Sequence, residues 1–295
     1  MATKLTPAIP MPNPTALAQL RDSGFAILRG ALDPALIANL QADLEEDFAN
    51  TPFGKGAFYG SRTRRFGRLL IRSPLAERLV RHPSVLDLVE TLLLPFCERI
   101  QLNTAQAIAV HPRAPAQMPH RDQDMWQAPK GEIEYLVNVM WPLTPFREGN
   151  GATRIWPGSH GRAALDTEEP DECLVPDLDP GDALIMLGST LHCASANRTT
   201  AERRGIVIGY SLGWLKPYEN QWLSYPPGLA RSFSPDLASL VGYCQHRPNL
   251  GNFEGQCPSV LLGSHDGRRL GAIDALRPDQ QAAVEAYEAA QKGGA

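Results

Sequence analysis

Apolar residues in the first third of the chain recur at the spacing of α-helices. After Asp33, apolar side chains stand mostly three or four positions apart, while Glu45, Glu46 and Asp47 lie off that stripe. The stripe consists of Leu36, Ile37, Leu40, Leu44 and Phe48. Asp33 followed by Pro34 is typical of a helix start, because Asp accepts hydrogen bonds from the first N–H groups and Pro suits the first helical position. The pattern predicts a helix that begins at Pro34.

Proline residues mark the predicted starts of three further helices, two before the centre of the chain and one near its end. Ser73-Pro74 and His82-Pro83 each resemble a helix start, and the second helix is expected to end near Leu94-Pro95. Before them lies a basic loop, "GSRTRRFGRLLIR". A last helix is predicted from Pro278 to about Gln291.

Residues 100 to 215 have a different pattern, typical of β-strands. Short runs rich in β-branched and aromatic residues are separated by Pro, Gly and Asn, with no long helix between them. The runs are "AQAIAV", "YLVNVMWPL", "TRIWP", "DALIML" and "GIVIGYSLGWL". Strands in this order favour an antiparallel sandwich or barrel.

The chain shows no internal repeat and no linker, so a single domain over 1–295 is predicted. Its expected divisions are a flexible start over 1–14, a helical part over 15–99 and a β core over 100–215. Residues 216–295 are rich in Pro and Gly and irregular apart from the last helix. This segment is expected to cover the active site as a lid or to cross to a second subunit of a homodimer.

Composition and charge exclude several classes of protein. An apolar share of 43% and a charged share of 20% are those of an ordinary globular protein. The net charge of −4, without a long basic block, disfavours a nucleic-acid partner. No apolar signal segment or membrane span is evident, so a cytoplasmic protein without a membrane partner is expected. Five scattered cysteines without a CxxC pair indicate reduced thiols.

The triplet His120-Arg121-Asp122 is the first candidate for chemistry. At the end of a strand, residues i and i+2 share a face, so His120 and Asp122 would point the same way. Such triplets arise easily by chance, and a metal site needs another ligand from elsewhere. Among the seven histidines His192 is the best third ligand, because it directly follows the strand "DALIML" and lies 72 residues after His120.

Two imidazoles and one carboxylate indicate a particular chemistry. This set leaves about three open positions on an octahedral ion, as in non-heme Fe(II) oxygenases. An Fe(II) ion with one carboxylate keeps a single positive charge, which suits a chelating α-keto acid. Arg203, eleven residues after His192, could bind a second carboxylate of that acid. Arg204 competes for this role, but strand alternation puts the two arginines on opposite faces, and spacing favours Arg203.

Longer motifs resemble the phytanoyl-CoA dioxygenase family of Fe(II)/2-oxoglutarate-dependent oxygenases. "AQMPHRDQDMW", "NGATRIWPGSH", "PGDALIMLGSTLH" and "LHCASANRTTAERR" follow one another in the family's order. The C-terminal stretches "GWLKPYENQWLSYPP" and "LASLVGYCQH" are similar to the branch that contains fungal meroterpenoid dioxygenases. The resemblance runs from about residue 15 to 260.

The resemblance implies a fold, a ligand set and cosubstrates. The fold would be mainly β with flanking helices, built on a double-stranded β-helix (jelly-roll) core. His120, Asp122 and His192 would hold Fe(II), and Arg203 would pair with the C5 carboxylate of 2-oxoglutarate. The remaining residues implied to contact this cosubstrate are Gln117, Thr153 and, by analogy with the fungal branch, Arg62. O₂ would be the other cosubstrate.

Some residues keep an alternative structural explanation. Thr153 suits a strand by propensity alone, and Gln117 could be a solvated strand end. The arginines of the basic loop are expected to be a mixture of solvated and inward-turned side chains; they are Arg62, Arg64, Arg65, Arg68 and Arg72. Four large aromatics could line the substrate cavity or serve as packing; they are Trp126, Trp141, Trp156 and Phe146.

The expected reaction is hydroxylation of an unactivated C–H bond in a small, largely apolar metabolite, with release of succinate and CO₂. Halogenating relatives have a small residue at the position of Asp122, so its presence favours hydroxylation or a related oxidation. An acyl-CoA or amino-acid substrate is the alternative within the class. A zinc hydrolase and a non-catalytic metal-binding jelly roll are the alternatives outside it.

Overall fold

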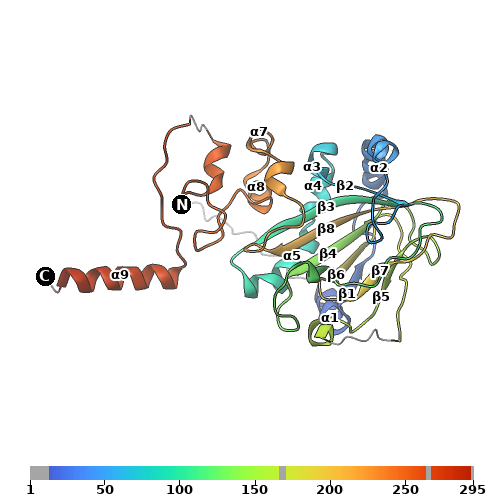
Figure 1. The fold of residues 1–295 in the computed structure, drawn as a ribbon, viewed down its shortest axis with the longest axis horizontal. Helices are drawn as coiled ribbons and strands as arrows, with labels where there is room; N and C mark the ends of the chain where they lie inside the picture. Colours follow the sequence, from blue (N-terminus) through green and yellow to red (C-terminus); the bar gives the residue numbers. More distant parts are fainter. Residues whose placement is uncertain (1–12, 166–170, 264–266, 294–295) are drawn as a thin grey trace, which may run out of the picture.

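The computed structural model describes residues 13–165, 171–263 and 267–293, and its centre is a six-stranded antiparallel sheet in the order β1-β6-β4-β8-β3-β2 (Figure 1). These strands are β1 (Phe25–Leu28), β2 (Thr63–Phe66), β3 (Ile100–Val110), β4 (Leu136–Pro142), β6 (Ala183–Leu187) and β8 (Arg203–Leu212). A second sheet pairs β5 (Thr153–Ile155) with β7 (His192–Ala194), and isolated bridges such as His120 to His192 extend it. Together the sheets form the predicted jelly roll.

Strand alternation gives the large sheet two different faces. In β3, Ala105, Ala107 and Ala109 belong to the main hydrophobic core, while Gln106 and Ile108 line a cavity on the other face. This follows from the period of two in a strand, where successive side chains point to opposite sides. One face therefore packs against helices and the other is available for a site.

Of the helices that cover the core face, α2 (Pro34–Asn50) and α5 (Pro83–Leu93) begin at the prolines where the sequence predicts a start, and α4 (Ala76–Val80) begins two residues after the predicted start at Pro74. Asn13 accepts hydrogen bonds from Thr15 N and Ala16 N and caps α1 (Pro14–Ser23). Asp33 accepts from Ala35 N and caps α2, as expected. Short helices α3 (Leu69–Arg72) and α4 follow, and α5 ends one residue before Leu94. Buried leucines of these helices pack on the sheet, which confirms the amphipathic assignment.

Two parts of the chain differ from expectation. The N-terminal part is not purely helical, because β1 and β2 leave it to become the edges of the large sheet. The C-terminal part is less irregular than expected, since it contains α6 (Gln221–Ser224), α7 (Pro227–Ala230) and α8 (Pro235–Leu240). Short helices capped by Asn220 and Ser234 carry too few residues to show a period in the sequence. Most of the predicted flexible start, residues 1–12, lies outside the described residues.

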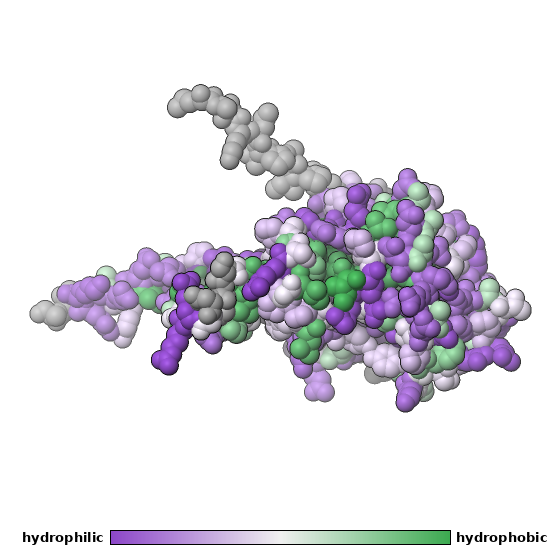
Figure 2. All heavy atoms as spheres, turned by 90° about the horizontal axis from the view of Figure 1, so that it is seen from above, coloured by the Kyte–Doolittle hydropathy of each residue, from purple (hydrophilic) through white to green (hydrophobic). Residues whose placement is uncertain are grey.

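After α8 the chain leaves the body as an arm that ends in α9 (Pro278–Gly293), close to the predicted bounds (Figure 1). Nearly all described side chains of α9 are exposed. Seen from above, the surface is largely hydrophilic, and apolar side chains gather near the place where the arm leaves the body (Figure 2). Exposed apolar residues of the neighbouring helices include Trp222, Leu223 and Leu229. Among the described helices, none has the length and apolar character that a membrane crossing requires.

Candidate active site

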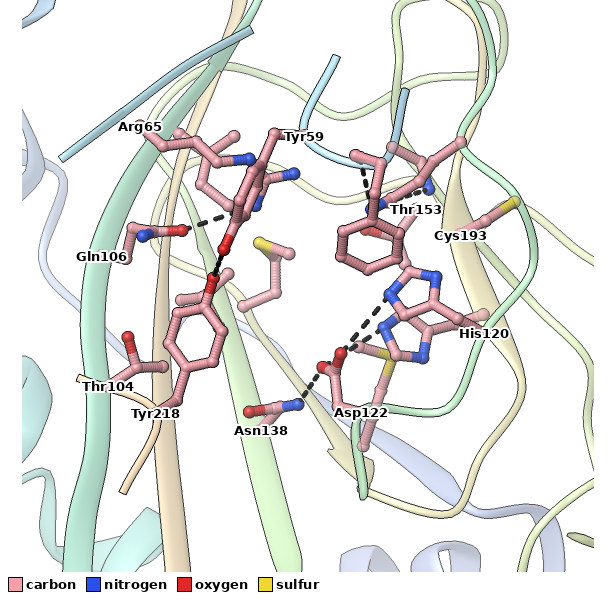
Figure 3. Close-up of a pocket in the computed structure, with 18 of the residues that line it drawn as sticks. Tyr59, Arg65, Thr104, Gln106, His120, Asp122, Asn138, Thr153, Cys193 and Tyr218 are labelled. Carbon is pink, nitrogen blue, oxygen red and sulfur yellow. Dashed lines mark hydrogen bonds and ion pairs between the residues drawn. The ribbon is translucent and has the colours of Figure 1, made fainter. Parts of the chain in front are cut away.

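A cavity of about 910 Å³, including its open mouth, lies on the free face of the large sheet and contains His120, Asp122 and His192 (Figure 3). Its sheet wall is largely apolar, formed by Ile108, Val110, Leu136, Met140, Met186 and Val207. Polar side chains also line the cavity, with His120 and Asp122 on one side and Arg65, Gln106 and Tyr218 across from them (Figure 3).

The three predicted metal ligands come together. One ligand atom from each of His120, Asp122 and His192 lies within 4.8 Å of the others. The Nε2 atom of His120 is 3.4 Å from Asp122 Oδ1, and that of His192 is 3.5 Å from Asp122 Oδ2. Paired backbone hydrogen bonds of 3.0 Å in both directions join His120 to His192 and hold the two rings together.

The local structure around the triplet is not the one expected. His120 and Asp122 do not end a regular strand: His120 forms an isolated bridge, and Asp122 opens a 3₁₀ turn, η2 (Asp122–Met125). The shared direction of their side chains therefore comes from the bridge and the turn. The sequence contains no period over so short a segment from which this could be read.

Hydrogen bonds at the far side of each ring fix the histidine tautomers. His120 Nδ1 is 2.9 Å from the carbonyl oxygen of Met118, and His192 Nδ1 is 3.0 Å from that of Thr190. A carbonyl oxygen only accepts, so each Nδ1 carries the proton and donates it. Each Nε2 then presents a lone pair toward Asp122, which is the arrangement found in metal-binding histidines. The donor set fits a divalent ion of the Fe(II) or Zn(II) type.

Asp122 remains ionised in this environment. Burial opposes its charge, but in their protonated forms the adjacent His192 and His120 hold the pKa of its carboxyl well below the usual range, and a divalent ion bound between the neutral rings would favour the carboxylate in the same way. Asn138 Nδ2 also donates to Asp122 Oδ2. Asn138 lies on β4 opposite Gly209 of β8, where a Cβ would be 2.8 Å from the Asn138 Oδ1 atom. Glycine at this position leaves the space in which the amide orients the carboxylate.

Arg203, the first residue of β8, lines the cavity and is only 3% exposed. Its Nε donates to the carbonyl oxygen of Gly151 at 3.0 Å, and its guanidinium lies 4.3 Å from the centre of the Phe146 ring. Burial, with a contribution from Arg65, lowers the pKa of Arg203 to about 9, so it is charged at neutral pH. No carboxylate in the described part of the chain forms an ion pair with it. Arg204 points away from the cavity and pairs with Glu45 and Glu202.

Gln117 and Thr153 both line the cavity next to the metal ligands. Gln117 pairs through its backbone N–H with Ala194, and its Nε2 donates to Phe58 O at 3.2 Å. Thr153 is 4% exposed and lies on β5, paired with Ala194 of β7. Their predicted contacts with a cosubstrate stay predictions, but their positions allow them.

The structure places Arg65, and not Arg62, in the cavity. Arg62 is outside the lining residues, and its Nε donates to Pro112 O. Arg65 lies on β2 opposite Ile108 of β3, on the strand face that looks into the cavity. The basic loop thus contains side chains of different orientation, as expected. Arg65 points into the cavity, whereas Arg64 turns away from it and donates to the carbonyl oxygens of Phe48 and Ala49.

The large aromatics serve as packing, one of the two roles considered for them. Trp141, Trp156 and Phe146 are buried in hydrophobic clusters, and Trp126 donates to Lys216 O. The aromatic residues that line the cavity are Phe58, Tyr59 and Tyr218, none of which was predicted. Asn138 was also missed, although a lone amide in the apolar run "YLVNVMWPL" was a signal that could have found it.

Comparison with known proteins gives a family match over most of the chain. The family model described as Phytanoyl-CoA dioxygenase (PhyH) matches residues 20–205. "Dioxygenase aneA" of Aspergillus aculeatus is 30% identical over 251 residues, which cover 78% of this chain and 84% of that protein. "Dioxygenase trt7" of Aspergillus terreus is 29% identical over 245 residues, or 79% of this chain and 85% of the relative.

Solved structures share the fold at lower identity. The epimerase SnoN from nogalamycin biosynthesis, described as non-heme and alpha ketoglutarate dependent, superposes with a TM-score of 0.56 at 21% identity, covering 68% of this chain and 82% of its own. HygX from Streptomyces hygroscopicus, solved with nickel and 2-oxoglutarate, gives 0.56 at 14% identity over 70% and 90%.

Proposed function

Because the chain belongs to the phytanoyl-CoA dioxygenase family, we propose that His120, Asp122 and His192 hold its Fe(II) and that it hydroxylates a small, largely apolar metabolite. The protein is an enzyme of the Fe(II)- and 2-oxoglutarate-dependent dioxygenase class; its relatives are named dioxygenases, and the structural neighbour SnoN is described as non-heme and alpha ketoglutarate dependent. The residue roles and the reaction on the substrate are the proposal. The observation that carries it is the convergence of two Nε2 lone pairs and one carboxylate within 4.8 Å.

Fe(II) with 2-oxoglutarate and the side chains of the protein have different tasks in the proposed reaction. Fe(II) with 2-oxoglutarate supplies the oxidant: O₂ is consumed, the keto acid loses CO₂ to become succinate, and the second oxygen atom enters the substrate C–H bond. The chain holds the ion through one carboxylate, so the site keeps one positive charge for the keto acid. In this proposal Arg203 binds the far carboxylate of 2-oxoglutarate and Gln117 and Thr153 orient it; the support is that all three side chains line the cavity.

The apolar sheet wall supports an apolar substrate. Side chains such as Ile108, Val207 and Met140 offer no hydrogen bonds, so they gain free energy only by covering hydrocarbon. An acyl-CoA or amino-acid substrate remains the alternative. The loop arginines give the acyl-CoA alternative little support, because Arg64, Arg68 and Arg72 are each bonded to the protein itself.

A zinc hydrolase would use the same three ligands but has no use for Arg203. A buried guanidinium without a carboxylate partner costs free energy unless a ligand supplies the anion. The 2-oxoglutarate-dependent reaction explains this residue, and the hydrolase does not.

Anaerobic addition of Fe(II) and 2-oxoglutarate tests the proposed function. We expect a weak visible charge-transfer band that needs both additions, and slow succinate release once air is admitted. Mass spectrometry of a turned-over metabolite should show the gain of one oxygen atom, as hydroxylation requires. This measurement is needed because proteins of the same fold include an epimerase, SnoN, and a carbocyclase, SnoK. Tight Zn²⁺ binding with neither band nor succinate would contradict the proposal.

A further inference from the structure

A second polar wall faces the metal ligands across the cavity (Figure 3). It consists of Arg65 from β2, Gln106 from β3, Tyr59 from the segment before β2, and Tyr218 from the segment after β8. The proposed positions of Fe(II) and 2-oxoglutarate involve none of these four side chains. The wall therefore needs an explanation of its own.

Arg65 has hydrogen-bond donors without partners. Its Nη1 donates to Gln106 Oε1 at a long 3.4 Å, and its buried Nε has no partner in the described structure. Its guanidinium lies 5.6 Å from the centre of the Tyr59 ring, which gives a weak cation–π contact. Burial lowers the pKa of Arg65, with Tyr218 and Asp122 opposing this, yet guanidinium stays protonated in proteins. A partly buried cation with free donors is typical of an anion site.

The two tyrosines add one more donor beside Arg65. Their hydroxyl groups hydrogen-bond to each other, which uses one of the two protons. The other phenol proton has no recorded acceptor among the described residues, so one O–H can turn toward a ligand. Apart from Gln106 Oε1, this wall offers donors and a positive charge, and it contains no carboxylate.

The charges of the loaded site do not balance. Fe(II), Asp122, Arg65 and Arg203 together carry three positive charges, and 2-oxoglutarate brings two negative ones. One positive charge remains in a largely apolar cavity, where an unpaired charge is unfavourable. A substrate with one negative charge would neutralise it.

We propose that Arg65, together with Tyr59 and Tyr218, binds a carboxylate of the substrate. The inference rests on the proposed function and names its substrate class: an apolar carboxylic acid, held by its acid group at one wall so that its hydrocarbon lies along the sheet toward the metal ligands. Arg65 is then a specificity-determining residue. The carboxylate could come instead from 2-oxoglutarate, so the experiment must separate the two sources.

Paired ligands that differ only in charge test the proposal. The probes are benzoate, 4-tert-butylbenzoate and dodecanoate, each with its uncharged primary amide, titrated by calorimetry under argon into protein loaded with Fe(II) and 2-oxoglutarate. We expect at least one acid to bind about 10- to 100-fold more tightly than its amide, the range of a hydrogen-bonded charge pair. Arg65→Met should abolish this preference, Arg65→Lys should restore part of it, and Tyr218→Phe should reduce it by a smaller factor.

The same proteins are titrated with 2-oxoglutarate, followed by the visible band. Arg65→Met should leave the 2-oxoglutarate Kd within about twofold of wild type if the substrate supplies the carboxylate. Arg162→Met serves as the matched control, because it removes one positive charge from a side chain that is 83% exposed. A large loss of 2-oxoglutarate affinity in Arg65→Met would overturn the proposal, as would acids that bind no better than their amides. Absence of the band in the wild-type protein would instead contradict the proposed function itself.

Discussion

At the scale of single residues, the site depends on groups that do not touch the metal position. Met118 and Thr190 contribute only backbone carbonyl oxygens, yet these decide which ring nitrogen of His120 and His192 carries the proton. Because any side chain leaves a carbonyl in place, the tautomers depend on the backbone path and are insensitive to the residue types at 118 and 190. Asn138 differs in this respect, because it orients Asp122 through its side-chain amide, which donates to Asp122 Oδ2.

Asp122→Ala should remove the anionic ligand and abolish 2-oxoglutarate turnover. We expect succinate release to fall at least about 100-fold, because a two-histidine site binds a divalent ion weakly and retains too much positive charge. The matched control is Asp124→Ala, which removes an exposed carboxylate of the same turn that pairs with Lys130. Full succinate release by Asp122→Ala would refute its role as a ligand.

Arg203→Met and Arg204→Met form a second matched pair. Arg203→Met should raise the 2-oxoglutarate Kd about 10- to 100-fold, since it removes a charge-assisted hydrogen bond. Arg204→Met should leave that Kd unchanged and lower the free energy of unfolding, because Arg204 joins Glu45 of α2 to the start of β8. Anaerobic titration and urea denaturation measure the two effects, and exchanged outcomes would show that the wrong arginine was chosen.

The roles of single residues could be predicted from the sequence only where the residues belong to a recognisable motif. His120, Asp122, His192 and Arg203 follow from residue types and spacing that a metal and a keto acid require. The choice between Arg62 and Arg65 depends on which face of β2 looks inward, and the sequence does not reveal that a four-residue strand exists there. Tyr59 and Tyr218 come from irregular segments, whose meeting depends on the tertiary fold alone.

At the scale of elements, glycines in β8 determine what the cavity face can hold. Gly209→Ala would place a Cβ atom 2.8 Å from Asn138 Oδ1 and 3.2 Å from Thr104 Cγ2. We expect Asn138 to be displaced from Asp122 and the Fe(II) affinity to fall about tenfold, the low end for loss of a group that orients a ligand. Gly228→Ala, where the added Cβ meets nothing within 4 Å, is the control. Unchanged Fe(II) affinity in Gly209→Ala would contradict this role of Asn138.

The start of β6 is joined to the loop after β1 by Asp182. Its carboxylate accepts hydrogen bonds from Gly30 N, Asp179 N and Arg29. Burial opposes its ionisation, but these donors hold the pKa of Asp182 below its usual range. A lowered pKa in the folded state contributes stability above the unfolded-state pKa, and this contribution is lost as the pH falls through the folded value.

Asp182→Asn should therefore lower the free energy of unfolding by about 1–3 kcal/mol at pH 7. The difference from wild type should shrink below about pH 4, because the carboxylate is then protonated in the unfolded chain while the folded state still keeps it charged, until the folded carboxylate is protonated as well at lower pH. Urea denaturation at several pH values measures this, with the exposed Asp179→Asn as a control. A difference that stays constant with pH would show that the charge of Asp182 is not responsible.

Long, strongly patterned elements were the predictable ones. The stripe of α2, the cap at Asp33 and the runs of β3, β4, β6 and β8 are visible because each repeats its period several times. The edge strands β1 and β2 have four residues each and lie between helices, so their pattern is too short to identify them. The turn at Asp122 directly follows the bridge between His120 and His192, which is a tertiary contact.

At the scale of the whole molecule, α9 is the least integrated of the described helices. Apart from the half-buried Gln280, the described side chains of α9 are exposed. A chain shortened to end at Arg277 should keep its free energy of unfolding within about 0.5 kcal/mol, as expected when only surface residues are lost. Light scattering of the full and the shortened chain would test the predicted homodimer by giving the number of subunits in each. A shortened chain that is less stable, or that has fewer subunits than the full chain, would show that a second copy covers α9.

The two faces of the large sheet have a consequence for how such an enzyme changes over generations. Odd-numbered positions of β3 from Ala105 to Ala109 carry the folding energy with the helices, while Thr104, Gln106 and Ile108 look at the substrate space. Successive positions of the strand therefore have different roles. A substitution at a position that faces the cavity can change which substrate binds, while the packing of the sheet against the helices stays as it is. New specificities are then accessible through single nucleotide steps that each leave a viable protein.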